Sequence, residues 1–143
     1  MRRLGTNQLQ LLLIEDNPAD ANLVEEALAE AQLDCNLRLM DDGAAAIEFI
    51  SRVDADPHGT GPDLILLDLN LPKVNGEEVL KHIRLSPKCR HAKVMIISSS
   101  DAPSDRERAM NLGASEYFRK PSNLDQFMEL GRRVRAMLED GKA

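Results

Sequence analysis

The sequence predicts an α/β domain built on a doubly wound parallel sheet. Short apolar runs of the β type alternate along the chain with segments whose apolar residues recur at helical spacing, such as Val79, Leu80 and Ile83. The run Leu64–Leu67 is apolar at every position, which is typical of a central strand covered on both faces. This alternation indicates a parallel sheet with helices on both sides.

Five strands and five helices account for the chain. The expected strands are Leu9–Ile14, Cys35–Met40, Asp63–Leu67, Lys93–Ser98 and Glu116–Arg119. The stretch from Val53 to Pro62 is polar and rich in Asp, Gly and Pro, so we expect it to form a surface loop before the third strand. The last helix is expected to begin near Leu124 and to end near Asp140, with its apolar residues on one stripe.

Several helix starts are signalled by capping residues. Asn17-Pro18 offers a cap that is followed by proline at the first helical position. Two further starts have the spacing of capping boxes, namely Ser104 with Glu107 and Ser122 with Asp125.

The composition excludes several classes of protein. In 143 residues, 18 basic and 24 acidic side chains give a net charge of −6, which disfavours binding to nucleic acid or to an anionic membrane. No aliphatic run approaches the roughly 20 residues that a membrane helix needs. Cys35 and Cys89 form neither a CxxC motif nor a metal-binding spacing, and they indicate reduced thiols in a cytoplasmic protein. One domain spanning residues 1–143, without an effector domain, is expected.

Charged and hydroxyl side chains stand where four of the expected strands end. Ligand sites of open parallel sheets form at this edge, so these side chains are expected to lie together. Clustered carboxylates repel one another unless a cation neutralises them, and hard oxygen ligands in this number suit Mg²⁺. A lysine among them could meet a phosphate as a point charge. The residues, in chain order, are Glu15-Asp16, Asp68, Ser98-Ser99 and Lys120-Pro121.

Each of these residues alone has an ordinary structural interpretation. An acid after a strand is usually a helix cap or a solvated loop residue, and a lysine before proline is usually a surface charge. Complementary groups at four separate strand ends favour a functional site instead. The histidines His58, His82 and His91 have no partner pattern and are expected at the surface.

The strand-end residues belong to a longer ordered set of motifs. The others are Leu69-Asn70-Leu71-Pro72, Asn75-Gly76, Gly113-Ala114 and Tyr117. The complete set resembles the receiver domain of two-component response regulators, and the likeness covers roughly Leu9 to Asp140. Within that family, Leu67–Pro72 and the long loop before the third strand are similar to single-domain regulators encoded beside bacterial phytochrome kinases. The resemblance implies a flavodoxin-like fold with strand order 2-1-3-4-5.

The resemblance also implies roles for the residues of the site. Asp68 would accept a phosphoryl group from a phosphohistidine of a sensor histidine kinase. Asp16, Asp68 and the backbone carbonyl of Asn70 would hold Mg²⁺, with Glu15 acting through a bound water. Lys120 would pair with the carboxylate before transfer and with the phosphoryl oxygens afterwards, and the Lys120–Pro121 peptide bond is expected to be cis.

Two switch residues and three flanking residues complete the implied site. Ser98 would form a hydrogen bond to the phosphoryl group, and Tyr117 would turn inward in response. Ser99 is small, so it would leave the acyl phosphate accessible. Asn70 and Ser100 flank the phosphoryl group and would influence how long it survives.

The resemblance implies a phosphoacceptor switch that is not an enzyme in the turnover sense. With no effector domain expected, its signal would leave through a face formed by the fourth helix, the fifth strand and the last helix, called the output face below. Apolar residues such as Met110 and Met128 are expected there beside the charged residues 105–108. Such a mixed surface suits a homodimer contact or an unknown downstream protein target.

Other classes fit the motifs less well. A haloacid-dehalogenase phosphatase needs a second acid two residues after its nucleophile, where this chain has Asn70. A flavodoxin binds FMN phosphate on the loop after the first strand, where this chain offers repelling carboxylates. Neither a P-loop nor a nucleophile elbow occurs. The remaining alternative is a receiver fold that acts only as an interaction module, although such domains normally lose the acceptor, an acid or the lysine.

Overall fold

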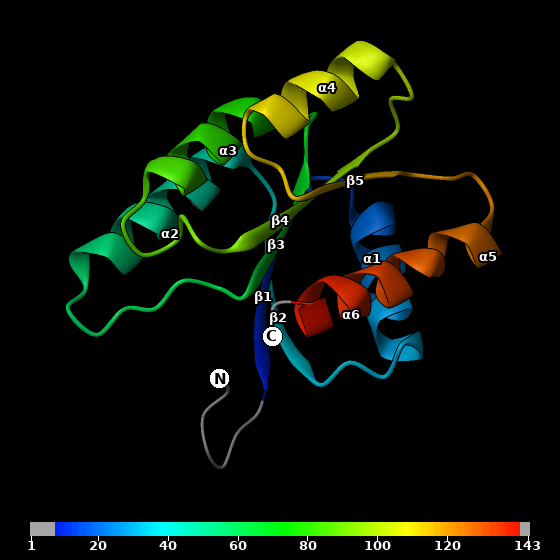
Figure 1. Ribbon diagram of the computed structural model, residues 1–143, viewed down its shortest axis with the longest axis horizontal. Helices are drawn as coiled ribbons and strands as arrows, with labels where there is room; N and C mark the ends of the chain where they lie inside the picture. The colour runs from blue at the N-terminus through cyan, green and yellow to red at the C-terminus, as the bar shows by residue number, and fades with distance from the viewer. Residues whose placement is uncertain (1–7, 141–143) are drawn as a thin grey trace.

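The computed structural model describes residues 8–140 and shows a five-stranded parallel sheet with helices on both faces (Figure 1). The strands are β1 (Leu9–Ile14), β2 (Cys35–Met40), β3 (Leu64–Asp68), β4 (Lys93–Ser98) and β5 (Glu116–Arg119). The helices are α1 (Pro18–Glu30), α2 (Gly43–Ala55), α3 (Gly76–Leu85), α4 (Pro103–Asn111), α5 (Leu124–Phe127) and α6 (Glu129–Asp140). Their order across the sheet is β2-β1-β3-β4-β5. The expected doubly wound, flavodoxin-like α/β fold is therefore confirmed.

Two hydrophobic clusters fill the layers on either side of the sheet. Because successive strand residues point to opposite faces, Leu12 packs toward α2, α3 and α4, whereas Leu11 and Leu13 pack toward α1, α5 and α6. Figure 1 shows the same division of the helices between the two faces. All five residues of β3 are buried, as expected for a strand covered on both sides.

Strand β3 lies one residue further along the chain than expected. Its first expected residue, Asp63, instead uses its side chain to accept a hydrogen bond of 2.7 Å from the backbone of Gln10. At the other end, Asp68 pairs in register with Ile97 of β4. The carboxylate of Asp68 is thus carried by the last residue of a buried central strand.

Three of the expected helix signals need correction. Helix α4 begins at Pro103 after Ala102, which offers no side-chain cap, so the expected capping box of Ser104 and Glu107 is wrong. Helix α5 is capped by Asn123, whose side chain accepts from the backbone of Gln126, and not by Ser122. For α4, proline at the first helical position fixes φ in advance, and for α5 the amide oxygen of Asn123 caps as well as a hydroxyl does. The third correction concerns the end of a helix: α2 continues to Ala55, so the loop that follows it begins later than Val53.

The expected last helix is divided into α5 and α6 at Met128. The backbone of Met128 keeps helical angles (φ −65°, ψ −18°), so the chain changes direction little. Gly131 of α6 lies against the backbone of Ala27 in α1, and a Cβ atom there would clash with the Ala27 carbonyl oxygen. This close approach fixes the last helix against α1. Among the described residues, no helix is long and apolar enough to cross a membrane.

Candidate functional site

Three carboxylates gather at the carboxyl edge of the sheet, where the sequence predicted them. Glu15 follows β1, Asp16 comes next, and Asp68 ends β3; one oxygen from each lies within 4.8 Å of the others. Glu15 and Asp68 are 1% and 4% exposed, whereas Asp16 faces solvent. Two buried acids and one accessible acid therefore share one small volume.

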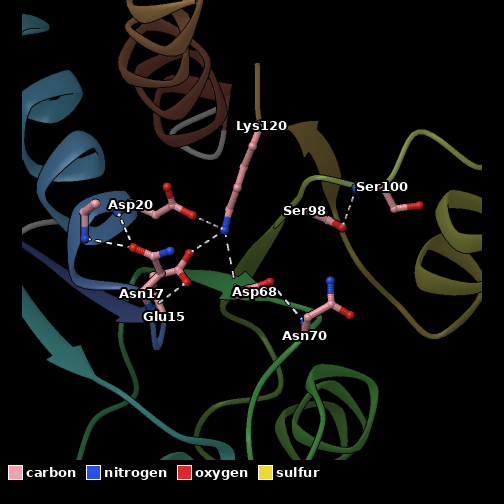
Figure 2. A network of polar contacts seen from close by, with 9 residues as sticks. Glu15, Asn17, Asp20, Asp68, Asn70, Ser98, Ser100 and Lys120 are labelled. Carbon is pink, nitrogen blue, oxygen red and sulfur yellow. Dashed lines mark hydrogen bonds and ion pairs between the residues drawn. The ribbon is translucent and has the colours of Figure 1, made fainter. Parts of the chain in front are cut away.

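The Lys120 ammonium group neutralises this cluster in part. Its Nζ atom lies 2.9 Å from Oε1 of Glu15 and 3.6 Å from Oδ2 of Asp68 (Figure 2). Burial alone would lower the pKa of Lys120, but its contacts with Asp20 and Glu15, and the charge of Asp68, outweigh burial and raise that pKa. The ammonium is therefore fully charged at neutral pH.

Glu15 is the carboxylate of the cluster whose charge is least well stabilised. Its Oε2 accepts a hydrogen bond of 3.1 Å from the backbone of Asn17. Its Oε1 is close to Lys120 but has no partner in hydrogen-bond geometry among the residues described. Burial first, and then the neighbouring Asp68, raise the pKa of Glu15 from its ordinary 4.5 to about 7, although Lys120 opposes the shift. Beside the Lys120 ammonium, this buried oxygen keeps lone-pair capacity that a cation or its bound water would use.

The sequence interpretation missed Asp20, the nearest carboxylate to the lysine. Its Oδ2 lies 2.7 Å from Lys120 Nζ, closer than either Glu15 or Asp68. Asp20 stands in the first turn of α1, where Asn17 accepts hydrogen bonds from the backbone of Ala19 and of Asp20 itself. The signal available in the sequence was its position four residues after Asp16, on the turn that leaves the acidic strand end.

The opposite side of Asp68 is lined by Asn70 and by the end of β4. The Asn70 backbone donates a hydrogen bond of 3.0 Å to Oδ1 of Asp68, and Ser98, 1% exposed, accepts one of 3.1 Å from the backbone of Ser100 (Figure 2). A groove of about 240 Å³ reaches this side and includes both Asn70 and Ser98 in its wall. Ser99 is exposed. The flanking residues thus lie around the mouth of the site, and their effect on phosphoryl lifetime stays a prediction.

Tyr117 already occupies an inward position. It is 3% exposed, and its hydroxyl donates a hydrogen bond of 3.0 Å to the carbonyl of Ser100. The structure therefore shows the inward arrangement, and the inward turn on phosphorylation stays a prediction. On the expected output face, Met110 is 38% exposed, but Met128 is only 8% exposed. The placement of Met128 on the surface was wrong, because its side chain packs in the cluster between the sheet and α1, α5 and α6.

The Lys120–Pro121 peptide bond is not cis. No cis peptide occurs within residues 8–140, so that expectation was wrong. A prolyl peptide favours trans by about 0.5–1 kcal/mol, and the trans chain here already brings the ammonium to the carboxylates. The backbone of Lys120 also donates a hydrogen bond of 2.7 Å to the Ser98 carbonyl, which ties the two strand ends together.

The donor set fits a divalent cation that prefers oxygen. Three carboxylates supply oxygens at one point, one of them accessible and one with a buried oxygen whose close neighbour is the Lys120 ammonium. Mg²⁺ is usually held by one or two carboxylates together with waters and a phosphate, so this set suits it. The three histidines, by contrast, are exposed, as expected, and lie outside the cluster.

Comparison with known proteins agrees with this geometry. The family model of the response regulator receiver domain matches residues 11–131. The chain is 35% identical over 120 residues to the response regulator Rcp1 of Synechocystis sp., covering 84% of this chain and 82% of that protein. The crystal structure of the phosphorylated cyanobacterial phytochrome response regulator RcpA is 31% identical, with a TM-score of 0.82 over 95% of this chain and 97% of that one. The Mn²⁺-bound form of Rcp1 is 33% identical, with a TM-score of 0.78 over 90% and 92% of the two chains. Because the family model spans most of the sequence and these relatives share the fold almost from end to end, the chain belongs to the response regulator receiver domain family.

Proposed function

We propose that Asp68 accepts a phosphoryl group from a phosphohistidine of a sensor histidine kinase. A carboxylate oxygen of Asp68 forms a bond to phosphorus while the bond from phosphorus to the histidine nitrogen breaks. The histidine keeps the electron pair of that bond. The observation that carries this proposal is the buried Asp68 carboxylate at the end of β3, with the Lys120 ammonium 3.6 Å from its Oδ2 atom.

The residues around Asp68 suit this reaction. Phosphoryl transfer depends mainly on in-line positioning and on neutralising the phosphoryl oxygens. Lys120 supplies one positive charge that does not titrate near neutral pH. Ser98 lies at the end of the neighbouring strand β4, and its hydroxyl can donate to a phosphoryl oxygen while it accepts from Ser100.

Asp16, Asp68 and the backbone carbonyl of Asn70 are the residues that would hold Mg²⁺, with Glu15 acting through a bound water. When bound, Mg²⁺ supplies positive charge that offsets the charge of the phosphoryl oxygens. The cluster of three carboxylates supports this assignment, and so does the Mn²⁺-bound form in which the similar Rcp1 was solved.

The proposed output is a change at the face formed by α4, β5 and α6. A phosphoryl group adds about −1.5 to −2 charge, which Ser98 can follow through a new hydrogen bond. Ser98 and Tyr117 both contact Ser100, at the start of the loop that leads into α4. Met110 supplies an exposed apolar side chain on this face. We propose that the face carries a homodimer contact or a contact to a downstream protein.

We also propose a kinase partner and a cellular location. The similar RcpA is a phytochrome response regulator, which makes a bacterial phytochrome a candidate for the kinase. Both cysteines are free thiols, which supports a cytoplasmic location. The chain is proposed to act by being phosphorylated and dephosphorylated, and not as a turnover enzyme.

The test is phosphoryl uptake from acetyl phosphate with Mg²⁺, read by intact mass. Wild type should gain the mass of one phosphoryl group, and Asp68→Asn should gain none, because an amide is a poor nucleophile and a poor metal ligand. Asp125→Asn makes the same change at an exposed acid outside the cluster, and should take up the group as wild type does. A wild type that gains no mass would favour the alternative, a receiver fold that acts only as an interaction module.

A further inference from the structure

The Lys120 ammonium is shared unequally among three carboxylates. It lies 2.7 Å from Asp20, 2.9 Å from Glu15 and 3.6 Å from Asp68. The contact with Asp20 is the shortest and has hydrogen-bond geometry, the Glu15 contact is a close ion pair, and the Asp68 distance is too long for a hydrogen bond. The lysine therefore points at a residue outside the acceptor and outside the three-carboxylate cluster.

Asp20 is held in place by its own helix. It stands in the first turn of α1, where the Asn17 side chain fixes the backbone at the helix start. The Asp20 side chain is 26% exposed, compared with 12% for Lys120 and 6% for Asp68. Asp20 is therefore the better hydrated of the two acids, whereas Asp68 has little access to water.

From this arrangement we propose that Asp20 is a positioning residue that competes with the phosphoryl group for Lys120. The proposal rests on the proposed function, since it concerns the same acceptor. While Asp68 is free, Asp20 draws the ammonium away from it, which leaves Asp68 and Asp16 available to the metal. When a phosphoryl group is on Asp68, its oxygens must take the ammonium from Asp20. The identity of residue 20 thus sets the balance between the two forms.

The variant Asp20→Asn keeps the shape of the side chain and removes its charge. The freed ammonium should move toward Glu15 and Asp68 and compete with Mg²⁺, so Mg²⁺ affinity should fall. At saturating Mg²⁺, beryllofluoride, which stands in for the phosphoryl group on Asp68, should bind more tightly. Each change is expected to be on the order of two- to fivefold, the range of a partly exposed ion pair. Calorimetry measures the first, and ¹⁹F NMR titration the second.

Loss of one negative charge could produce both shifts directly through space, so the experiment needs a cycle through Lys120. The Mg²⁺ affinity is measured for wild type, Asp20→Asn, Lys120→Gln and the double variant. If Asp20 acts through the ammonium, Asp20→Asn should lower the affinity in wild type but much less in the Lys120→Gln background. An equal reduction in both backgrounds would overturn the proposal in favour of a direct charge effect.

A control variant guards against general effects of charge and folding. Glu25→Gln removes one exposed charge from the same helix and should change neither affinity. Thermal melts of every variant report whether it is folded. If wild type binds Mg²⁺ and beryllofluoride and Asp20→Asn binds both equally well, the proposal is wrong and the function stands. If wild type binds neither, the proposed function fails, and the role of Asp20 fails with it.

Discussion

The hydroxyl group of Tyr117 donates a hydrogen bond of 3.0 Å to the backbone carbonyl of Ser100. The backbone N–H of Ser100 in turn donates to the hydroxyl of Ser98, and its side chain donates a bond of 2.6 Å to Asp105 of α4. Ser100 thus forms hydrogen bonds with Ser98, with Tyr117 and with Asp105 of α4. A movement of Ser98 would displace Ser100, and through it the hydrogen bonds to Tyr117 and Asp105.

The first prediction follows from this connection. Tyr117→Phe removes only the hydroxyl group, so it should leave phosphoryl uptake at Asp68 intact while it uncouples uptake from association at the output face. The stability cost should be about 1 kcal/mol, the usual net value of one hydrogen bond. Tyr117→Ala should uncouple the two as well, but the cavity in the core would cost about 3–5 kcal/mol. Sedimentation of wild type and Tyr117→Phe, with and without beryllofluoride, measures the coupling. An equal response in both proteins would exclude the hydroxyl group from the signal.

The sequence could predict most of the sheet, because each strand has its own apolar pattern. It missed the true bounds of β3 because those depend on partners in other strands. The Asp63 side chain accepts a hydrogen bond from the backbone of Gln10, and Asp68 pairs in register with a residue of β4. The acidic cluster was predictable, since the carboxyl ends of parallel strands must meet at one edge.

The pairing of Asp20 with Lys120 could not be predicted in the same way. The two residues are 100 positions apart, and which carboxylate receives the ammonium depends on how the start of α1 lies relative to the chain that leaves β5, and on which acid is buried. The predicted surface position of Met128 was wrong for a related reason. The segment from Leu124 to Asp140 has apolar residues near the boundary between surface and core, and the packing of α6 against α1 decides which of them are covered.

The second prediction concerns the metal. Asp16→Asn should weaken Mg²⁺ binding sharply, because Mg²⁺ loses its waters reluctantly and needs anionic oxygens to hold it. Glu15→Gln should weaken binding less if Glu15 acts through a water. Mg²⁺ should raise the melting temperature of wild type by mass action, and should do so little in Asp16→Asn. Calorimetric titration gives the affinities, and equal values for wild type and Asp16→Asn would remove Asp16 from the ligand set.

The third prediction is a pH dependence that originates in Glu15. Because the fold raises the pKa of Glu15 from 4.5 to about 7, the folded state binds the proton more tightly than the unfolded state does. The stability that this proton contributes is complete below about pH 4.5 and is lost as the pH rises through about 7. Without metal, wild type should therefore lose on the order of 2 kcal/mol relative to Glu15→Gln across this window. Urea unfolding of both proteins in chelator at several pH values measures the difference.

Mg²⁺ should reverse this trend. A metal ion and a proton compete for the same carboxylates, so Mg²⁺ affinity should rise with pH up to about 7 and then level off as Glu15 becomes fully ionised. The Glu15→Gln protein should show a flatter profile. A difference between the two proteins that stays constant across the window would contradict the assignment of this titration to Glu15.

The last prediction concerns the backbone that holds Asp68. Gly76, at the start of α3, lies against the chain that leaves β3, and a Cβ atom there would clash with the Asp68 carbonyl and lie 2.6 Å from the Leu69 Cα atom. Gly76→Ala should therefore displace this segment, cost about 1–3 kcal/mol in stability and weaken Mg²⁺ binding. Gly131→Ala is the matched control, because it forces a similar clash between α6 and α1 at Ala27, outside the carboxylate cluster. It should cost stability while Mg²⁺ affinity is kept. Urea unfolding measures the stability of both variants, and calorimetry measures their Mg²⁺ affinity. If Gly131→Ala lost as much Mg²⁺ affinity as Gly76→Ala, general destabilisation, and not displacement of Asp68, would explain the result.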